Sequence, residues 1–391
     1  MAVLTRSDCE GFDGDDQLAP FRDRFVIEDP DLVYLDGNSL GRLSHDVVAA
    51  VDQTMRVEWG RGLVGSWEHW VDIATRVGDL IGTNLLGAEP GETLAGDSTT
   101  VNLHKVLTAA CADRPGPIVC DPREFPTDRY VAAAVSDVEP GIVAGAGVVL
   151  RSVVDYRTGE LQDLAAVTVQ AHAAGALMVW DCSHAVGVVP LDLRGAGADL
   201  AVGCTYKHLS AGPGAPAWLW VREEHHDRLV PPLAGWWGQR DRFAMDAPWS
   251  PLPGVAGWAS GTPNVIGLAA VEAAVGIVVA AGIDAIRAKS RRLTAVAIEV
   301  ADLFGLDVVS PRDPDRCGAH VAVRHEHAAP IVLALRSRGV VPDLRPPDLV
   351  RVGLSPLTTR FVDVWDGMAA MADVIAGDEW RAFAGVVPDV T

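Results

Sequence analysis

Two polar residues that follow short apolar runs, Asp181 and Lys207, carry the strongest chemical signal in the chain. The apolar run 176–180 stops at Asp181, and the run 200–204 leads through Thr205 to Tyr206 and Lys207. Such runs are typical of buried parallel strands, whose carboxyl ends form the ligand-binding edge of an α/β sheet. We therefore expect the two residues, 26 positions apart, to face each other there. A lysine that forms a Schiff base and an acid that holds a pyridinium nitrogen are what pyridoxal phosphate (PLP) requires, although a solvated surface pair would show the same spacing.

The composition predicts an ordered protein with a large core. Its 391 residues permit one large domain and a smaller one, and 49% are hydrophobic against 21% charged. The net charge of −20 and the isoelectric point of about 4.8 argue against nucleic acid or an anionic membrane as a partner.

Cysteine usage and the apolar stretches indicate a cytoplasmic protein without a membrane span. The first ten residues lack the apolar region of a signal peptide, and the longest apolar stretch, 267–283, is interrupted by Glu272. The six cysteines show no CxxC pair or ligand-like cluster, so we expect reduced thiols and no metal site. His325 and His327 flank Glu326 at an expected strand end, and we interpret them as solvated because no further ligand lies nearby.

The order of strand and helix patterns predicts an α/β fold. Residues 1–30 are polar and are expected to be irregular, and Ser44 is a candidate N-cap for a helix that runs to about residue 59. Strands and helices alternate over 92–220, which predicts a large domain with a mostly parallel sheet flanked by helices. A long helical segment, 265–303, then leads to a smaller C-terminal α+β domain. We divide the chain into an N-terminal arm that contributes to the active site (1–45), the large PLP-binding domain (46–290) and the small domain (291–391).

Eight short motifs, in order along the chain, resemble those of the kynureninase family, which belongs to the fold type I PLP enzymes. They are YLDGNSLG (34–41), GDSTTVNLHK (96–105), FPTD (125–128), WDCSH (180–184), GCTYKHL (203–209), GWWG (235–238), GTP (261–263) and VRVGLSPL (350–357). The resemblance covers about residues 25–375. It implies PLP-dependent hydrolysis of the Cβ–Cγ bond of L-kynurenine, which gives anthranilate and L-alanine, by a homodimer with its active site at the interface.

The resemblance also assigns roles to individual residues. Lys207 binds PLP and moves protons, Asp181 keeps the pyridine nitrogen protonated, and Tyr206 hydrogen-bonds the phosphate. Small hydroxyl residues at a helix start suit a phosphate, although plain N-capping would use the same residue types. The other cofactor residues it implies are Thr99, Thr100 and Trp236 at the phosphate, Phe125 on the ring, Asp128 near the nitrogen, His184, and Thr262 at the closing loop.

The expected substrate residues are Arg351, Asn38, Trp67 and Trp237. Arg351 has the fork geometry that binds a carboxylate bidentately, Asn38 belongs to the turn placed near that carboxylate, and the two tryptophans would contact the aromatic ring. Three positions depart from the family pattern: Trp70, Gln239 and Thr358. They leave open a modified kynurenine or another 4-oxo amino acid as substrate. A carbon–sulfur lyase or cysteine desulfurase is a further alternative, for which Cys317 is the only cysteine after Lys207.

Overall fold

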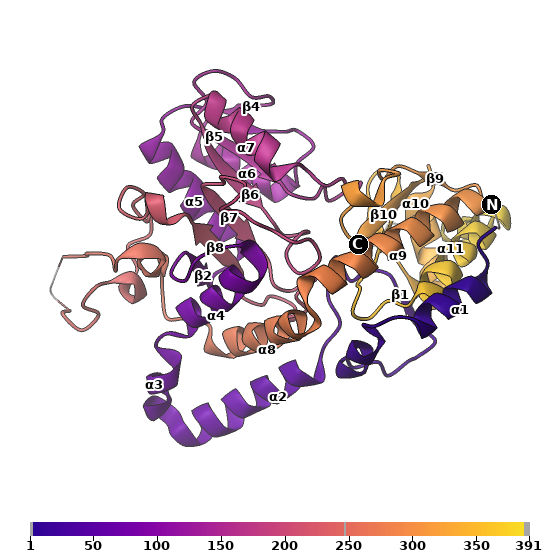
Figure 1. Cartoon of the computed structure of the whole chain (residues 1–391), viewed down its shortest axis with the longest axis horizontal. Coiled ribbons are helices and arrows are strands. Elements are labelled where there is room, and N and C mark those ends of the chain that lie inside the picture. Colours follow the sequence, from indigo (N-terminus) through magenta and orange to yellow (C-terminus); the bar gives the residue numbers. More distant parts are fainter. Residues whose placement is uncertain (1–2, 246–247, 387–391) are drawn as a thin grey trace.

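The computed structural model describes residues 3–245 and 248–386, and its centre is a seven-stranded sheet (Figure 1). The strands run in the order β2-β8-β7-β6-β5-β3-β4. Their bounds are β2 Thr93–Ala95, β3 Ile118–Cys120, β4 Val138–Glu139, β5 Val148–Ser152, β6 Leu177–Asp181, β7 Leu200–Gly203 and β8 Trp218–Val221. Only the pairs that involve β8 are antiparallel. The predicted mostly parallel sheet is therefore confirmed.

Helices pack against this sheet and bury its strands, as expected for parallel strands that read as continuous apolar runs. They are α4 Ile73–Ile81, α5 Thr99–Asp113, α6 Pro126–Val135 and α7 Leu164–Ala173, and α8 Val265–Ala281 packs in turn on α4. β6, β7 and β8 are buried along their whole length. The short helix α3 (Trp67–Trp70) comes after α2 (His45–Gln53) along the chain, on the outer side of this large unit (Figure 1).

A smaller unit is built on a four-stranded sheet with the order β12-β13-β10-β9. Its strands are β9 Asp307–Val308, β10 His320–Arg324, β12 Asp343–Arg345 and β13 Leu349–Gly353, and its helices are α9 Ile283–Leu303, α10 Ala328–Ser337 and α11 Phe361–Ala376. β1 (Val33–Tyr34) pairs in parallel with β11 (Val340–Val341) and so ties the N-terminal segment to this unit. The α+β character predicted for the C-terminal part is confirmed.

Two hydrophobic cores correspond to the two units. The first extends from Leu18 to Ile286 and also takes in Ala319 and Leu357. The second joins Cys9 and Leu35 to apolar residues between Leu293 and Trp380. The N-terminal segment contributes to both cores. The division into segments 1–45, 46–290 and 291–391 stays a prediction.

The expectation that residues 1–30 are irregular is wrong. Residues Arg6–Gly14 form helix α1, which begins with a capping box between Thr5 and Asp8. Cys9 is completely buried, and the Phe12 ring packs edge-on against Phe361 of α11, 5.7 Å between ring centroids. The helix was missed because its sequence is mostly polar, and its narrow apolar side packs on α11, which is distant in the sequence.

Two predictions of long helices need correction, one at its C-terminal end and one at its middle. Ser44 caps α2 (His45–Gln53) through its side chain, as predicted, but the helix then widens into a π-helical segment over Thr54–Gly62. The expected helix 265–303 is two helices, α8 and α9, which meet at Gly282 with a φ of 81° and are bent by 79°. Within the described ranges no single helix is long and apolar enough to cross a membrane, and only this bent pair passes that test jointly.

A buried carboxylate at the amino end of the sheet holds three segments together. Asp199, directly before β7, lies 2.8 Å from His172 Nε2 and 2.7 Å from His225 Nε2, and it accepts a hydrogen bond of 2.7 Å from the Met178 amide. Burial opposes its charge, but these hydrogen bonds outweigh burial and lower the pKa of the Asp199 carboxyl. The resulting stabilisation is present above the pKa of the unfolded chain and is lost as the pH falls through the lowered folded pKa.

We expect Asp199→Asn to lower the free energy of unfolding by about 2 kcal/mol at pH 7, because one charge-assisted hydrogen bond is lost and another weakened. The difference from wild type should shrink between pH 7 and pH 3, because the stabilisation is lost as the pH falls below the ordinary range of an aspartate and through the lowered folded pKa of Asp199. Urea denaturation at both pH values measures it. Asp52→Asn removes an exposed ion pair with Arg56 and should have a much smaller effect. Equal stability of Asp199→Asn and wild type at pH 7 would contradict this account.

Candidate active site

The parallel pairing of β6 and β7 brings Asp181 and Lys207 to one edge of the sheet. Asp181 is the last residue of β6 and lies in register with Val202 of β7. β7 ends at Gly203, and Lys207 follows within a turn that the sequence TYKH forms beyond it. Asp181 is 7% exposed, and its negative charge acts on the Lys207 amine. The shared edge predicted from the two apolar runs is confirmed.

A glycine of the N-terminal segment lets the chain approach the lysine turn closely. Gly41 donates its amide to the Tyr206 carbonyl at 2.9 Å. A Cβ on Gly41 would lie 2.4 Å from the Lys207 carbonyl oxygen and 2.2 Å from Ser210 Oγ. The end of YLDGNSLG therefore packs directly on the lysine, and a side chain at position 41 would push the two segments apart.

The Lys207 amine is buried among groups that favour its neutral form. Its Nζ lies 2.9 Å from His184 Nε2 and about 6 Å from the centres of the Phe125 and Tyr206 rings. Burial lowers the pKa of the Lys207 amine, although the charge of Asp181 acts in the opposite direction. Burial and the lysine charge also hold the pKa of His184 well below its usual range. A neutral amine is the form that acts as a nucleophile.

Carboxyl groups gather beside Asp181. Asp128, in the first turn of α6, is 2% exposed, and its Oδ2 has no partner among the described side chains and backbone groups. Burial, followed by the charges of Asp181 and Glu124, raises the pKa of Asp128 well above its ordinary value. An unpartnered buried acceptor beside a second carboxylate suits a cationic N–H donor such as a pyridinium nitrogen.

Glu124 and Ser152 belong to the same group, and sequence reasoning missed them. Glu124 accepts hydrogen bonds from the Ser152 amide at 3.0 Å and the Ser152 hydroxyl at 2.5 Å. Ser152 is in register with Asp181 on the neighbouring strand. Ser152 ends β5 as Asp181 ends β6, so the polar end of the run 148–152 was the available signal.

The N-terminus of α5 faces outward from the strand β2 that precedes it. Ser98 is the N-cap, and its Oγ accepts from the Val101 amide at 3.3 Å. Thr99 and Thr100 are the first two residues of the helix, where backbone N–H groups lack intrahelical acceptors. N-capping therefore falls to Ser98 and leaves both threonines available for an anion, but their phosphate role stays a prediction.

Arg351 is completely buried and already engaged. Its NH1 donates to the Tyr156 carbonyl at 2.6 Å, and its NH2 donates to Ser39 Oγ at 2.9 Å and to the Asp343 carboxylate. Asp343 sits opposite Arg351 in the β12–β13 ladder, and sequence reasoning missed it although the alternation of the strand puts both on one face. The Arg351 Nε has no partner among the described residues. Burial lowers the Arg351 pKa to about 10, against the opposing effect of Asp343.

The N-terminal turn lies against the same sheet. Asn38 is completely buried, and neither of its side-chain polar atoms has a hydrogen-bond partner within the described chain. A Cβ on Gly353 would lie 1.9 Å from Asn38 Oδ1, so the glycine at the end of β13 makes room for the amide. Burial, and then the charge of Asp343, raises the pKa of nearby Asp36 to about 6.

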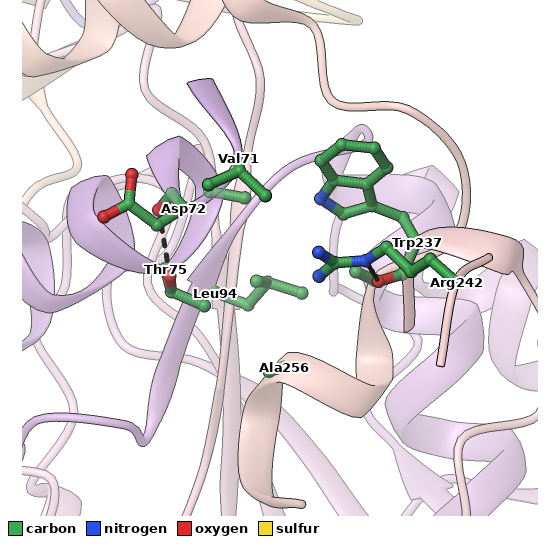
Figure 2. A pocket seen from close by; sticks show the side chains of 9 residues that line it. Val71, Asp72, Thr75, Leu94, Trp237, Arg242 and Ala256 are labelled. Atoms are coloured by element: carbon green, nitrogen blue, oxygen red, sulfur yellow. Dashed lines mark hydrogen bonds between the residues drawn. The ribbon is translucent and has the colours of Figure 1, made fainter. Parts of the chain in front are cut away.

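The three predicted tryptophans form a second group, in which their rings contact one another. The Trp67 and Trp237 rings are 5.3 Å apart, and Trp236 stands edge-on to Trp237 at 5.1 Å. Figure 2 shows Trp237 and Arg242 facing Val71 and Leu94 across a cavity of about 200 Å³. The Arg242 guanidinium stacks 4.5 Å from the Trp237 ring and donates from Nε to the Trp237 carbonyl. A second cavity, of about 390 Å³, is also bordered by Trp237 and is lined by residues that include Ser98 and Thr262.

The three departures from the family pattern have local partners. Trp70 donates its indole N–H to Glu58 at 2.7 Å and supports Trp67 edge-on. Gln239 accepts from the Ser250 amide at 2.6 Å and donates to the Pro248 carbonyl, so it closes the loop between them. Thr358 is buried beside His208 at a cavity of about 10 Å³.

PLP fits the residues of the sheet edge. An amine whose pKa burial lowers, a pair of carboxyls with an acceptor that has no partner among the described residues, and the Phe125 ring, 38% exposed, provide complementary chemistry for its aldehyde, pyridine nitrogen and ring face. Among the described residues no group of three or more His, Cys, Asp or Glu side chains is arranged to hold a metal ion. His327 instead stacks on Trp380 at 3.9 Å.

Comparisons with known proteins agree with the motifs. The fold is similar to that of the cysteine desulfurase of Thermococcus onnurineus NA1 in its apo form, with a TM-score of 0.76, 19% identity, and coverage of 88% of this chain and 95% of the other. Residues 286–371 match the family model for the kynureninase C-terminal domain. The chain is 38% identical to the kynureninase of Burkholderia pseudomallei (strain 1106a) over 97% of this chain and 98% of that protein, and 36% identical to that of Pseudomonas fluorescens over 97% of each. The chain therefore belongs to the kynureninase family of PLP-dependent hydrolases.

Proposed function

We propose that the protein hydrolyses the Cβ–Cγ bond of L-kynurenine and releases anthranilate and L-alanine. The observation that carries the proposal is the buried Lys207 amine opposite the Asp128 and Asp181 carboxyls, in a chain that is 38% identical to a kynureninase over nearly its whole length. When bound, PLP supplies an electron sink for the bond that breaks. Asp181, with Asp128 beside it, keeps the pyridine nitrogen protonated.

Lys207 has two tasks in this proposal. Its Nζ, whose pKa burial lowers, would hold the cofactor through the aldehyde, and when free it would move a proton from and to the substrate Cα. His184 Nε2, 2.9 Å from Nζ, is kept neutral by burial and so does not compete for charge in the site. Tyr206 stays a phenol, because burial raises the pKa of its hydroxyl, and a phenol can donate to the phosphate.

Arg351 and Asn38 receive the substrate carboxylate. The Arg351 Nε and both polar atoms of the Asn38 side chain are buried without partners among the residues that the structure describes, which is costly unless a ligand uses them. Asp343 and Ser39 hold the other side of the guanidinium and fix its plane. Trp67 and Trp237 offer apolar faces to the aminophenyl ring.

The desulfurase alternative lacks its nucleophile. Cys317 is completely buried, contacts the Pro311 carbonyl through its sulfur at 3.1 Å, and has a pKa raised to about 11 by burial. A reactive thiol needs exposure and a lowered pKa. The desulfurase-like fold therefore carries no argument for desulfurase chemistry. A modified kynurenine stays an alternative, because Thr358 borders a cavity in a part of the chain close to the lysine turn.

We further propose a homodimer with a shared active site, in the cytoplasm. Trp236 is 46% exposed and Thr262 is exposed, although both are assigned to cofactor binding. Large apolar side chains of the π-helical segment and its continuation are exposed as well: Met55, Val57, Trp59, Leu63 and Val64. Exposed apolar groups of this number are typical of an interface. All six cysteines are free, which fits a reducing compartment.

The pyridinium assignment predicts that Asp181→Asn retains PLP through the other contacts but loses turnover by several orders of magnitude, because an unprotonated pyridine is a poor electron sink. Steady-state assays with L-kynurenine measure turnover, and absorbance of the protein measures retained PLP. Asp128→Asn keeps Asp181 and should lose less. Near-wild-type turnover of Asp181→Asn would place the pyridinium partner elsewhere.

The substrate assignment predicts a preference for L-kynurenine over its 3-hydroxy derivative of about 10- to 100-fold in kcat/KM. A phenolic hydroxyl buried without a partner between indole faces is disfavoured, and none of Trp67, Trp237 and Thr262 offers an imidazole or amide. Trp67→His supplies a partner and should narrow the preference. Equal kcat/KM for both substrates in wild type would refute it, and turnover of neither would favour a modified substrate.

The shared active site predicts complementation between subunits. Lys207→Ala and Trp236→Ala proteins should each have little activity, but hybrids formed by mixing them contain one intact site and should regain activity. Each variant carried alone through the same unfolding and refolding is the control. Hybrids detected by native mass spectrometry without regained activity would show that each chain builds its site alone.

A further inference from the structure

A buried lysine outside the lysine turn, Lys105, has no part in the mechanism described so far. It lies inside α5 and is 1% exposed, although lysine is rarely buried without a partner. Its Nζ donates to Asp97 Oδ2 at 2.5 Å and to the Trp258 carbonyl at 2.8 Å. The positive charge of Lys105 is thus compensated by the Asp97 carboxylate and the Trp258 carbonyl.

Asp97 has an unusual backbone conformation. Its φ is 49°, in the left-handed region that residues other than glycine seldom adopt. The turn is fixed to the start of β8, because the Gly96 amide donates to the Ala217 carbonyl and the Ala217 amide donates to the Asp97 carbonyl, at 2.8 and 3.0 Å. The next residues are Ser98, Thr99 and Thr100, so the Asp97 backbone sets the direction of the first turn of α5.

The same carboxylate holds the loop that carries Thr262. Ser260 Oγ donates to Asp97, 3.0 and 3.1 Å from its two oxygens. The Ser260 carbonyl accepts from the Trp237 amide at 3.2 Å. Asp97, Ser98, Ser260 and Thr262 all line the cavity of about 390 Å³. One carboxylate therefore joins the start of α5 to the loop and to the aromatic segment.

We propose that Lys105 and Asp97 are positioning residues for the cofactor phosphate: their ion pair, buried on the lysine side, maintains the left-handed turn that directs the N-terminus of α5 and, through Ser260, places the loop that carries Thr262. The inference rests on the proposed phosphate site at Thr99 and Thr100. A purely structural pair would affect all ligands and the stability of the fold equally. A pair that positions the phosphate-binding residues should affect the binding of phosphate-bearing ligands selectively.

The test compares PLP with pyridoxal, which lacks the phosphate, in titrations of the apoproteins followed by absorbance. Lys105→Met and Asp97→Ala should raise the PLP dissociation constant about tenfold or more and leave that of pyridoxal within about twofold. Asp97→Asn is the matched control, because asparagine tolerates the left-handed conformation and keeps an acceptor for Lys105. It lacks the charge, so it should bind PLP more weakly than wild type but more tightly than Asp97→Ala, which loses the acceptor as well.

Three outcomes are informative. Unchanged PLP binding in Lys105→Met and Asp97→Ala, or equal weakening of PLP and pyridoxal, would overturn the positioning role alone. A wild-type protein that does not distinguish PLP from pyridoxal would remove the phosphate site together with this inference. Should either variant fail to fold, Ser260→Ala removes only a partly exposed hydroxyl from the same network and should still weaken PLP relative to pyridoxal.

Discussion

The register of β6 against β7 is the constraint on which the rest of the site depends. Asp181 closes one strand beside Val202 of the next, and the chain then has only a short turn in which to present Lys207. Parallel strands in this arrangement must be buried on both faces, so the two charged groups meet in a place that water reaches poorly. A shift of one residue in β6 would turn Asp181 to the opposite face of the sheet and separate the pair.

Burial then determines the protonation of each group differently. It favours the neutral forms of Lys207, Asp128 and His184, whose pKa values all shift in that direction. Arg351 is as deeply buried, yet it keeps Asp343 in contact and stays a cation at neutral pH. The sheet edge therefore combines neutral groups ready for proton transfer with a fixed cation for a carboxylate. Desolvation acts on all of these groups, but Arg351 keeps its charge because Asp343 is in direct contact with it.

The sequence predicts those parts of the site that depend on local pattern. Asp181 and Lys207 follow from the ends of apolar runs, and Ser44 follows from capping preferences. Glu124, Ser152 and Asp343 were missed because their importance comes from neighbours on other strands, which no local pattern specifies. Helix α1 and the bend at Gly282 were missed for a related reason: packing against α11 stabilises a polar helix, and a single glycine with positive φ redirects an otherwise continuous apolar segment.

The separation of the two residue groups within one chain is itself informative. Asp128, Asp181 and His184 beside Lys207 are buried, whereas Trp236 and Thr262 are exposed. Exposed indole rings and apolar helix residues are unfavourable in water. Trp236 and Thr262 can also bind a cofactor only if they lie beside it. The proposed dimer answers both requirements, since the same contact covers the apolar surface and carries these residues to a second lysine. Cofactor binding and subunit association would then stabilise each other, because each orders groups that the other needs.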